Sequence, residues 1–177
     1  MAKIEVGYTD YLKETNKMLG HGGVLLASVD AQGNPNVMTI GWGTVGIIWR
    51  KPIFVVLVRP SRYTHSLIEI TDDYTVNVPT PELADEVLYF GTVSGRDRDK
   101  FKVKGLTATP SKKVKAPIVA ECAIHYECSV VHKNDVIPDA LAEESHNSFY
   151  RNGDFHRIYF GEILSVYADV NAKKRLA

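Results

Sequence analysis

The segment IVAECAIHYECSVVH at 118–132 constrains the fold of this chain more than any other stretch. Its apolar and polar residues alternate for long enough to predict a β-strand, because successive side chains of a strand point to opposite faces. Cys122 and Cys128 lie six residues apart on it, an even offset that places both on one face. Their Cα atoms would be roughly 20 Å apart along a strand, so they cannot form a disulfide with each other. Two unpaired cysteines fit a reducing, cytoplasmic setting.

The rest of the chain divides into short segments whose periodicity changes at glycines and prolines. Further strands are predicted from alternating or β-branched runs at 23–29, 36–42, 53–58, 74–78 and 156–167. Helices are predicted at 8–19, near 64–71 and after Thr80-Pro81, with a short helical turn within 94–101. The stretch 43–51 is either strand or loop. With no regular βαβ repeat, these elements favour a mainly β fold, a largely antiparallel barrel with short peripheral helices.

The length of 177 residues predicts one domain over 1–177, with the N-terminal helix within 1–20 and a polar surface excursion at 133–155. The chain has 21 basic and 21 acidic residues, so neither a nucleic acid nor an anionic membrane is expected as a partner. The first residues lack the apolar core of a secretory signal. The longest nearly uncharged stretch, 35–49, is interrupted by polar residues and glycines, so no membrane span is expected either.

Two common kinds of site find no support in the sequence. His125 and His132 are separated by an odd offset on the predicted strand, which places them on opposite faces, and no H-E-x-x-H or C-x-x-C occurs. No metal site is therefore expected. The residues from Gly41 to Gly46 match G-x-G-x-x-G, but a dinucleotide site needs a helix to begin inside that motif. Here β-branched and aromatic residues follow and end at Pro52, so the motif is rejected.

The corner RPSRYTH at 59–65 concentrates hydrogen-bond donors between a predicted strand and a predicted helix. Arg59 and Arg62 can donate pairs of hydrogen bonds to phosphate oxygens, and the backbone N–H groups at a helix start favour an anion. Taken alone, the corner fits a phosphate site and a capped helix with surface arginines equally well. A second donor-rich patch, Ser94-Gly95-Arg96 with Lys100, would be a solvated turn if it stood alone.

Five motifs in one order along the chain carry a resemblance to a known family: NVMTIGW at 36–42, RPSRYTH at 59–65, NVP at 77–79, SGRDRDKF at 94–101 and HRIYFGE at 156–162. Together they resemble the flavin reductase-like family of FMN-binding split-barrel proteins, and its flavoredoxin branch most of all. The resemblance covers about residues 18–168.

The resemblance implies a homodimer of antiparallel, Greek-key split β-barrels that holds FMN non-covalently near the subunit interface. It implies that the isoalloxazine ring lies along one strand and that the corner at 59–64 holds the phosphate. The cofactor-binding residues it implies are Asn36, Val37, Met38, Thr39, Ile40, Arg59, Ser61, Arg62, Thr64, Asn77, Ser94, Gly95 and Lys100.

The resemblance leaves the electron donor open. Family members that use NAD(P)H directly often carry G-D-H before the last strand, whereas this chain has Gly153-Asp154-Phe155-His156 with one residue inserted. His156 is the candidate catalytic residue on the nicotinamide side of the flavin, or it is simply a histidine at a strand start. The function implied is an NAD(P)H-dependent flavin reductase, an electron carrier that exchanges electrons with a redox protein, or a non-redox FMN-binding module.

Overall fold

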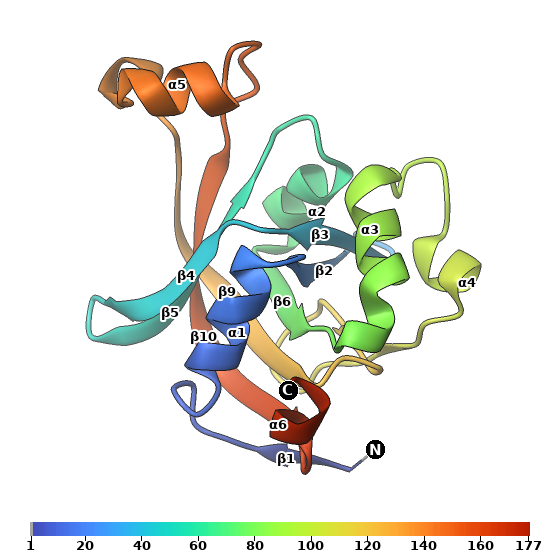
Figure 1. Cartoon of the computed structure of the whole chain (residues 1–177). Coiled ribbons are helices and arrows are strands. Elements are labelled where there is room, and N and C mark those ends of the chain that lie inside the picture. Colours follow the sequence, from blue (N-terminus) through green and yellow to red (C-terminus); the bar gives the residue numbers. More distant parts are fainter. Residues whose placement is uncertain (1) are drawn as a thin grey trace.

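The computed structural model describes residues 2–177 and consists of an antiparallel barrel with helices around it (Figure 1). One sheet has eight strands, and every pairing described in it is antiparallel. Its members are β1 (Lys3–Glu5), β2 (Val24–Val29), β3 (Pro35–Ile40), β4 (Gly43–Ile48), β5 (Lys51–Val58), β6 (Asp73–Val78), β9 (Ile124–Asp135) and β10 (Arg157–Asp169). The order is β3-β2-β6-β9-β10-β5-β4, and β1 also pairs with β10. The expectation of a mainly β, antiparallel fold is confirmed.

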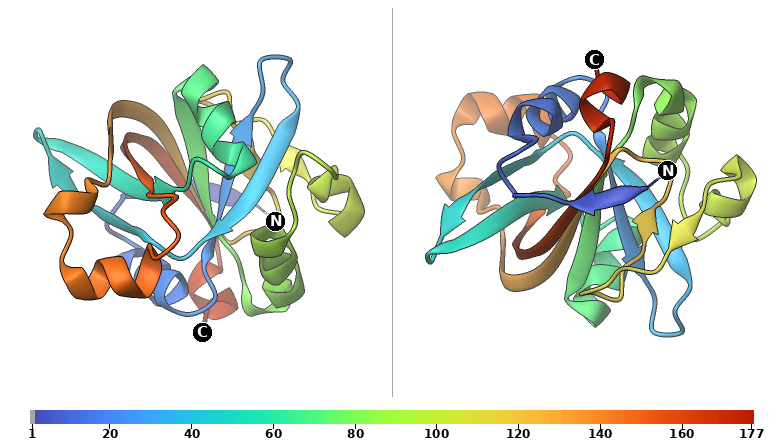
Figure 2. Two further views of the ribbon diagram at one scale, coloured as in Figure 1. Left: turned by 90° about the horizontal axis from the view of Figure 1, so that it is seen from above. Right: turned by 90° about the horizontal axis from the view of Figure 1, so that it is seen from below.

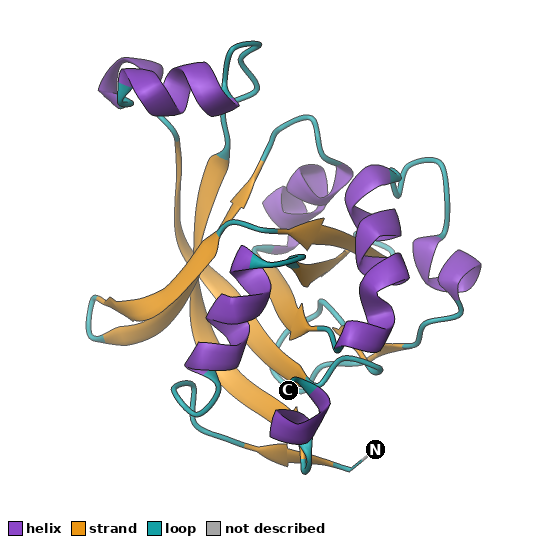
Figure 3. Ribbon diagram, viewed as in Figure 1, coloured by secondary structure: helices purple, strands orange, loops and turns teal. Residues whose placement is uncertain are grey.

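Helices lie around the sheet rather than within it, as Figure 3 shows by colour. They are α1 (Leu12–Gly20), α2 (Tyr63–Thr71), α3 (Ala84–Thr92), α4 (Lys100–Lys104), α5 (Glu143–Phe149) and α6 (Ala172–Arg175), with 3-10 turns at Pro81–Leu83 and Pro138–Ala140. Within residues 2–177, none of these helices is long and apolar enough to cross a membrane. A small second sheet pairs β7 (Ala108–Thr109) with β8 (Ile118–Val119).

Strand β2 is apolar except for Ser28, because both of its faces are covered. Val24 and Leu26 belong to the core inside the barrel, whereas Leu25 and Ala27 belong to a second core that includes Phe90 of α3. Successive side chains of β2 therefore point alternately into the two cores, although both of these sets of side chains are apolar. This arrangement holds α3 firmly against the outer face of β2 and β3.

The predicted strand 118–132 is interrupted, so the prediction that Cys122 and Cys128 lie on one face of a single strand was wrong. The chain turns between β8 and β9, and the N–H of Cys122 donates to the carbonyl oxygen of Val119 at 3.0 Å. Cys122 lies in the core beside α3 and Cys128 in the barrel core, so they do not share a face. Within residues 2–177 both cysteines are buried and free.

The ambiguous stretch 43–51 forms strand β4, a turn and the start of β5. Ile48 pairs with Lys51, so Trp49 and Arg50 make a two-residue turn, and both have a positive φ, 53° and 59°. Two residues with positive φ give the turn that best matches the twist of a hairpin. The hairpin projects from the body of the barrel (Figures 1 and 2). The excursion at 133–155 begins later than predicted, because β9 continues to Asp135.

Candidate functional site

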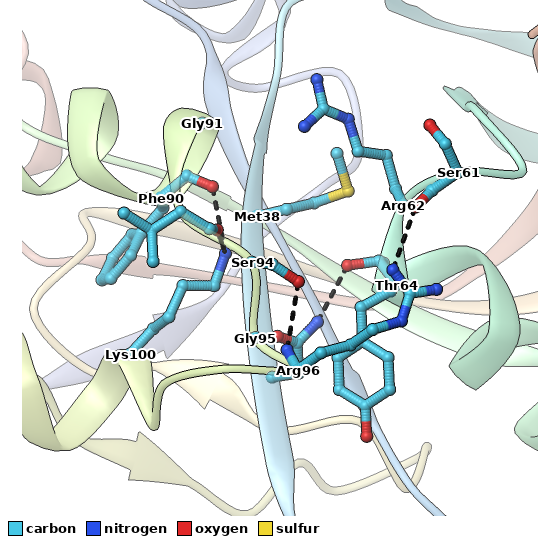
Figure 4. A pocket seen from close by; sticks show the side chains of 13 residues that line it. Met38, Ser61, Arg62, Thr64, Phe90, Gly91, Ser94, Gly95, Arg96 and Lys100 are labelled. Carbon is cyan, nitrogen blue, oxygen red and sulfur yellow. Dashed lines mark hydrogen bonds between the residues drawn. The ribbon is translucent and has the colours of Figure 1, made fainter.

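A pocket with basic walls lies between the start of α2, strand β3 and the loop that follows α3 (Figure 4). We call it the arginine pocket. The loop between β5 and α2 contributes one wall and the loop between α3 and α4 the other, so segments about 30 residues apart in sequence face each other. Its lining residues are Asn36, Met38, Ser61, Arg62, Tyr63, Thr64, Phe90, Gly91, Val93, Ser94, Gly95, Arg96 and Lys100.

The arginine pocket carries three cationic side chains, those of Arg62, Arg96 and Lys100. Among the described residues that line it, none carries a carboxylate. The guanidinium of Arg62 makes no hydrogen bond or salt bridge to any residue within 2–177, and Figure 4 shows it extending beside Met38 away from Thr64. A concentration of cations without anions attracts an anionic ligand even in a protein of zero net charge.

Lys100 is the unusual cation of this pocket because it is buried. Its Nζ donates to the carbonyl oxygens of Phe90 at 3.1 Å and Val93 at 2.9 Å, at the end of α3. Burial, and then the charge of Arg62, lower the pKa of Lys100 from 10.5 to about 8. The ammonium therefore holds the loop after α3 in place and is still mostly charged at neutral pH.

The floor of the arginine pocket is a hydrogen-bonded polar pair. Asn36 of β3 donates from Nδ2 to Oγ1 of Thr64 at 2.8 Å, and both side chains are buried. Gly95 lies directly over Asn36, because a Cβ added there would be 2.0 Å from the Asn36 Oδ1. Only glycine fits between the loop and this floor.

A second pocket continues from the first and contains Trp42, so we call it the tryptophan pocket. Met38 and Arg62 line both pockets, which makes one elongated site along β3. The lining residues of the second pocket are Met38, Thr39, Ile40, Gly41, Trp42, Leu57, Arg59, Arg62 and His156. A flat aromatic ligand can lie against the backbone of 38–42 here, with an anionic end in the arginine pocket.

His156 lies in the tryptophan pocket and is held in one orientation. Its Nδ1 is hydrogen-bonded to the hydroxyl of Tyr150 at 2.7 Å, and its ring centroid is 4.8 Å from that of Trp42. Burial, and then the charge of Arg59, lower the pKa of His156 to about 4. The imidazole is therefore neutral at physiological pH and can donate or accept a hydrogen bond from Nε2.

Arg59 lies at the tryptophan pocket, not in the arginine pocket. Its guanidinium donates to the carbonyl oxygens of Asp154 and Phe149, each at 2.9 Å, and lies 5.1 Å from the ring centroid of Tyr150. The hydroxyl of Ser61 donates to the Asp154 carboxylate at 2.6 Å. These contacts attach the end of the 133–155 excursion to the loop before α2, so Arg59 is engaged by the protein itself.

The structure brings most of the residues implied by the resemblance to this elongated site. Of that set, it does not bring Val37 or Asn77. Val37 is fully buried in the core beside α3. Asn77 is fully buried between strands, where its Oδ1 accepts from the N–H of Val119 at 3.0 Å and is hydrogen-bonded to Nδ1 of His125 at 2.7 Å.

The lining residues that the resemblance did not imply include three with large aromatic or charged side chains near the ligand site: Trp42, Tyr63 and Arg96. The sequence contained a signal for each of them. Trp42 and Tyr63 belong to the motifs that carried the resemblance, and Arg96 belongs to the donor-rich turn. No cluster of three or more histidine, cysteine, aspartate or glutamate side chains that could bind a metal occurs among residues 2–177.

Comparisons with known proteins identify a family and several similar folds. A family model described as "Flavin reductase like domain" matches residues 18–177. An uncharacterized protein of Archaeoglobus fulgidus is 38% identical over 132 residues, 75% of this chain and 64% of that protein. A Pyrococcus abyssi protein is 37% identical over 101 residues, 56% of each chain. The matched regions thus span less than two thirds of these two relatives.

Among solved structures, the flavoredoxin of Desulfovibrio vulgaris (Miyazaki F) has a TM-score of 0.69 at 25% identity, covering 84% of this chain and 70% of that one. An FMN-binding domain of a flavin reductase-like enzyme from Shewanella baltica has a TM-score of 0.68 at 20% identity, covering 96% and 78%. Both likenesses extend over most of the chain. The second shows the split-barrel fold alone, because its identity is low.

Proposed function

Because this chain belongs to the family of flavin reductase-like domains, we propose that it is an oxidoreductase that binds FMN non-covalently and transfers electrons through it. The observation that carries the proposal is the pairing of two pockets along β3. One is cationic and lacks carboxylates among its described lining residues, which suits a phosphate dianion, and the other is lined by backbone and aromatic groups, which suits a flat ring. When bound, the flavin supplies the redox chemistry, and the protein supplies binding, orientation and electrostatics.

The residues present fit FMN in two respects. Arg62 has a guanidinium without a partner among residues 2–177, directly where the pockets meet. Ser94 and Gly95 bring a loop close to Asn36 and Thr64, so backbone groups reach the pocket. We propose that Arg62, Ser61, Thr64, Ser94, Gly95 and Lys100 bind the phosphate end, and that the segment from Met38 to Trp42 contacts the ring.

The electron donor divides the proposal into two versions. In the first, NADH or NADPH reduces the flavin directly, and neutral His156 orients the nicotinamide from the tryptophan pocket. In the second, the protein is an electron carrier and a redox protein reduces the flavin. The ring of Phe149 comes from the excursion and its centroid lies 5.0 Å from that of Trp42. A bulky side chain beside the tryptophan pocket favours the second version, because a nicotinamide ring needs room next to the flavin.

The experiment that separates the two versions is an anaerobic reduction. The FMN-loaded protein is mixed with NADH or NADPH, and the flavin absorption near 450 nm is followed, with dithionite as a control that reduces accessible flavin without a nucleotide site. Rapid bleaching by a nucleotide supports the reductase. Bleaching by dithionite alone supports the carrier. Failure of the apoprotein to take up FMN would contradict both versions.

Lys100 makes FMN affinity depend on pH. Because its pKa is lowered to about 8, its charge is lost as the pH rises through that value in the free protein. FMN affinity should fall about fivefold across about pH 7 to 10, the difference between a charged and a neutral hydrogen bond. Fluorescence-quenching titrations measure it, and Lys100→Met should bind FMN more weakly at neutral pH, with a flatter profile. An unchanged profile in Lys100→Met contradicts the assignment.

The same pKa shift acts on the stability of the apoprotein in the opposite sense. The pKa of Lys100 is about 8 when folded and 10.5 as the unperturbed value, so between those values the unfolded chain binds more protons. The contribution of Lys100 to the free energy of unfolding therefore rises as the pH increases from about 8 to 10.5, while FMN affinity falls. Thermal melts of the apoprotein and its Lys100→Met variant separate the two effects.

We also propose that the protein is a homodimer located in the cytoplasm. Ile47 and Trp49 on the β4–β5 hairpin are 58% and 57% exposed, and a second copy would cover them. Two free, buried cysteines support a reducing compartment. Light scattering at micromolar concentration should give twice the mass of the chain, and a monomeric mass contradicts the dimer.

A further inference from the structure

Arg96 closes one end of the arginine pocket. Its Nη1 donates to the carbonyl oxygen of Ser61 at 3.0 Å, and its guanidinium carbon lies 5.3 Å from the ring centroid of Tyr63. Figure 4 shows the side chain lying across the gap between the loop after α3 and the start of α2. Below it, Gly95 packs against Asn36. The two walls of the pocket therefore meet at this end.

A further pocket lies beyond this wall, and we call it the aspartate pocket. It shares Asn36, Tyr63, Gly95, Arg96 and Lys100 with the arginine pocket, so these residues separate the two spaces. The charged residues that it adds are Asp30, Asp97, Arg98 and Asp99. With the shared Arg96 and Lys100, the aspartate pocket has three carboxylates and three cations, whereas the arginine pocket has three cations and no carboxylate among its described lining residues.

The aspartate pocket is also where a longer flavin would extend. An adenylate group joined to the flavin phosphate must leave the arginine pocket, and the aspartate pocket adjoins it directly across the Arg96 wall. FMN carries its two negative charges on one phosphate. FAD carries one negative charge on each of two phosphates. Its second phosphate would therefore place one of the two charges outside the arginine pocket, near the three carboxylates of the aspartate pocket.

We propose that Arg96 is a specificity-determining residue that restricts this protein to the mononucleotide FMN and disfavours FAD. The inference rests on the proposed function, because it concerns the ligand of the same site. To enter, FAD has to break the hydrogen bond from Arg96 to Ser61 and the contact with Tyr63. Its second phosphate then lies near Asp97 and Asp99, whereas FMN requires neither change.

The test is a calorimetric titration of riboflavin, FMN and FAD into the apoprotein of this chain and three variants. Wild type should bind FMN about 10-fold more tightly than FAD, the combined effect of one exposed charged hydrogen bond and one cation–π contact. Arg96→Ala should bind FMN more weakly and bring the FMN-to-FAD ratio to within about threefold. Arg96→Lys keeps the charge but not the planar fork, so it should retain more FMN affinity with a reduced ratio.

Arg98→Ala is the matched control. Arg98 is two residues away and carries the same charge, but it lines only the aspartate pocket. Its loss should leave FMN binding unchanged and should not help FAD. The inference is overturned if wild type binds FAD as tightly as FMN, or if Arg96→Ala and Arg98→Ala change the ratio equally.

The riboflavin measurement distinguishes this inference from the proposed function. If wild type binds neither riboflavin nor FMN, the proposed function fails and the inference falls with it. If FMN binds no more tightly than riboflavin, the assignment of the phosphate end fails. If FMN binds tightly and FAD binds equally well, only the role of Arg96 is wrong.

Discussion

Gly161→Ala is expected to lower the melting temperature of the apoprotein by about 6–12 °C, the equivalent of about 3 kcal/mol in a chain of this size. Gly161 lies on β10, where its pairing with β9 shifts register. A Cβ there would be 2.3 Å from Tyr74 Oη and 2.8 Å from Cys128 Cβ. Tyr74 cannot easily move away, because it is fully buried and its hydroxyl donates to the carbonyl oxygen of Phe54 at 2.5 Å.

Calorimetric melts check this result, and Gly46→Ala is the matched control. Gly46 is also a strand glycine, but a Cβ added there would meet no described atom within 4 Å. That variant should be neutral or slightly stabilised, because alanine loses less backbone entropy than glycine on folding. Combining Gly161→Ala with Tyr74→Phe removes the closest atom and should restore part of the loss. Equal melting of Gly161→Ala and Gly46→Ala would contradict the packing argument.

Arg62→Ala is expected to weaken FMN binding by about 10- to 150-fold and to leave riboflavin binding nearly unchanged. The reason is that a charged hydrogen bond contributes about 1.5–3 kcal/mol, and riboflavin has no phosphate to receive it. Arg62 lines both pockets, and its guanidinium has no hydrogen bond or salt bridge to residues within 2–177. Its removal therefore leaves no buried partner unsatisfied, and apoprotein stability should change little.

Arg59→Ala is the informative comparison, because it removes the same charge three residues earlier. Arg59 donates to the carbonyl oxygens of Phe149 and Asp154, so its loss frees the excursion and disturbs the ring site. FMN and riboflavin should lose affinity by a similar factor in Arg59→Ala. Fluorescence-quenching titrations of both flavins against the three proteins measure the difference. If Arg62→Ala harms both flavins alike, its guanidinium does not contact the phosphate.

The different positions of Arg59 and Arg62 could not be predicted from the local sequence. Both belong to one donor-rich corner, and both were expected at the phosphate end. Arg59 is engaged by carbonyl groups about 90 residues later in the chain. Arg62 lies beside Met38, and its guanidinium has no hydrogen-bond partner within residues 2–177. No pattern in RPSRYTH encodes the position of a segment so distant in sequence.

Asn77 and Cys122 illustrate the same limit in the core. Asn77 lies in a motif shared with a flavin-binding family, yet its side chain is completely buried and hydrogen-bonded to residues of β8 and β9. Cys122 lies in a largely alternating segment, yet the chain turns there. Alternation indicates that a strand is present, but not where it is interrupted or which layer covers each face.

Sequence patterns predict the mainly β class, most strands and helices, and the two donor-rich turns, because these depend on periodicity and on residues next to each other. The folded chain alone shows that the two turns form opposite walls of one pocket, that Trp42 and His156 share the adjoining pocket, and that Arg96 spans the end of the first. Those relations depend on the order of strands in the sheet and on α3 packing against β2 and β3. They arise from contacts between residues far apart in the chain, whose pairing is selected by the burial of the whole core rather than by any local pattern.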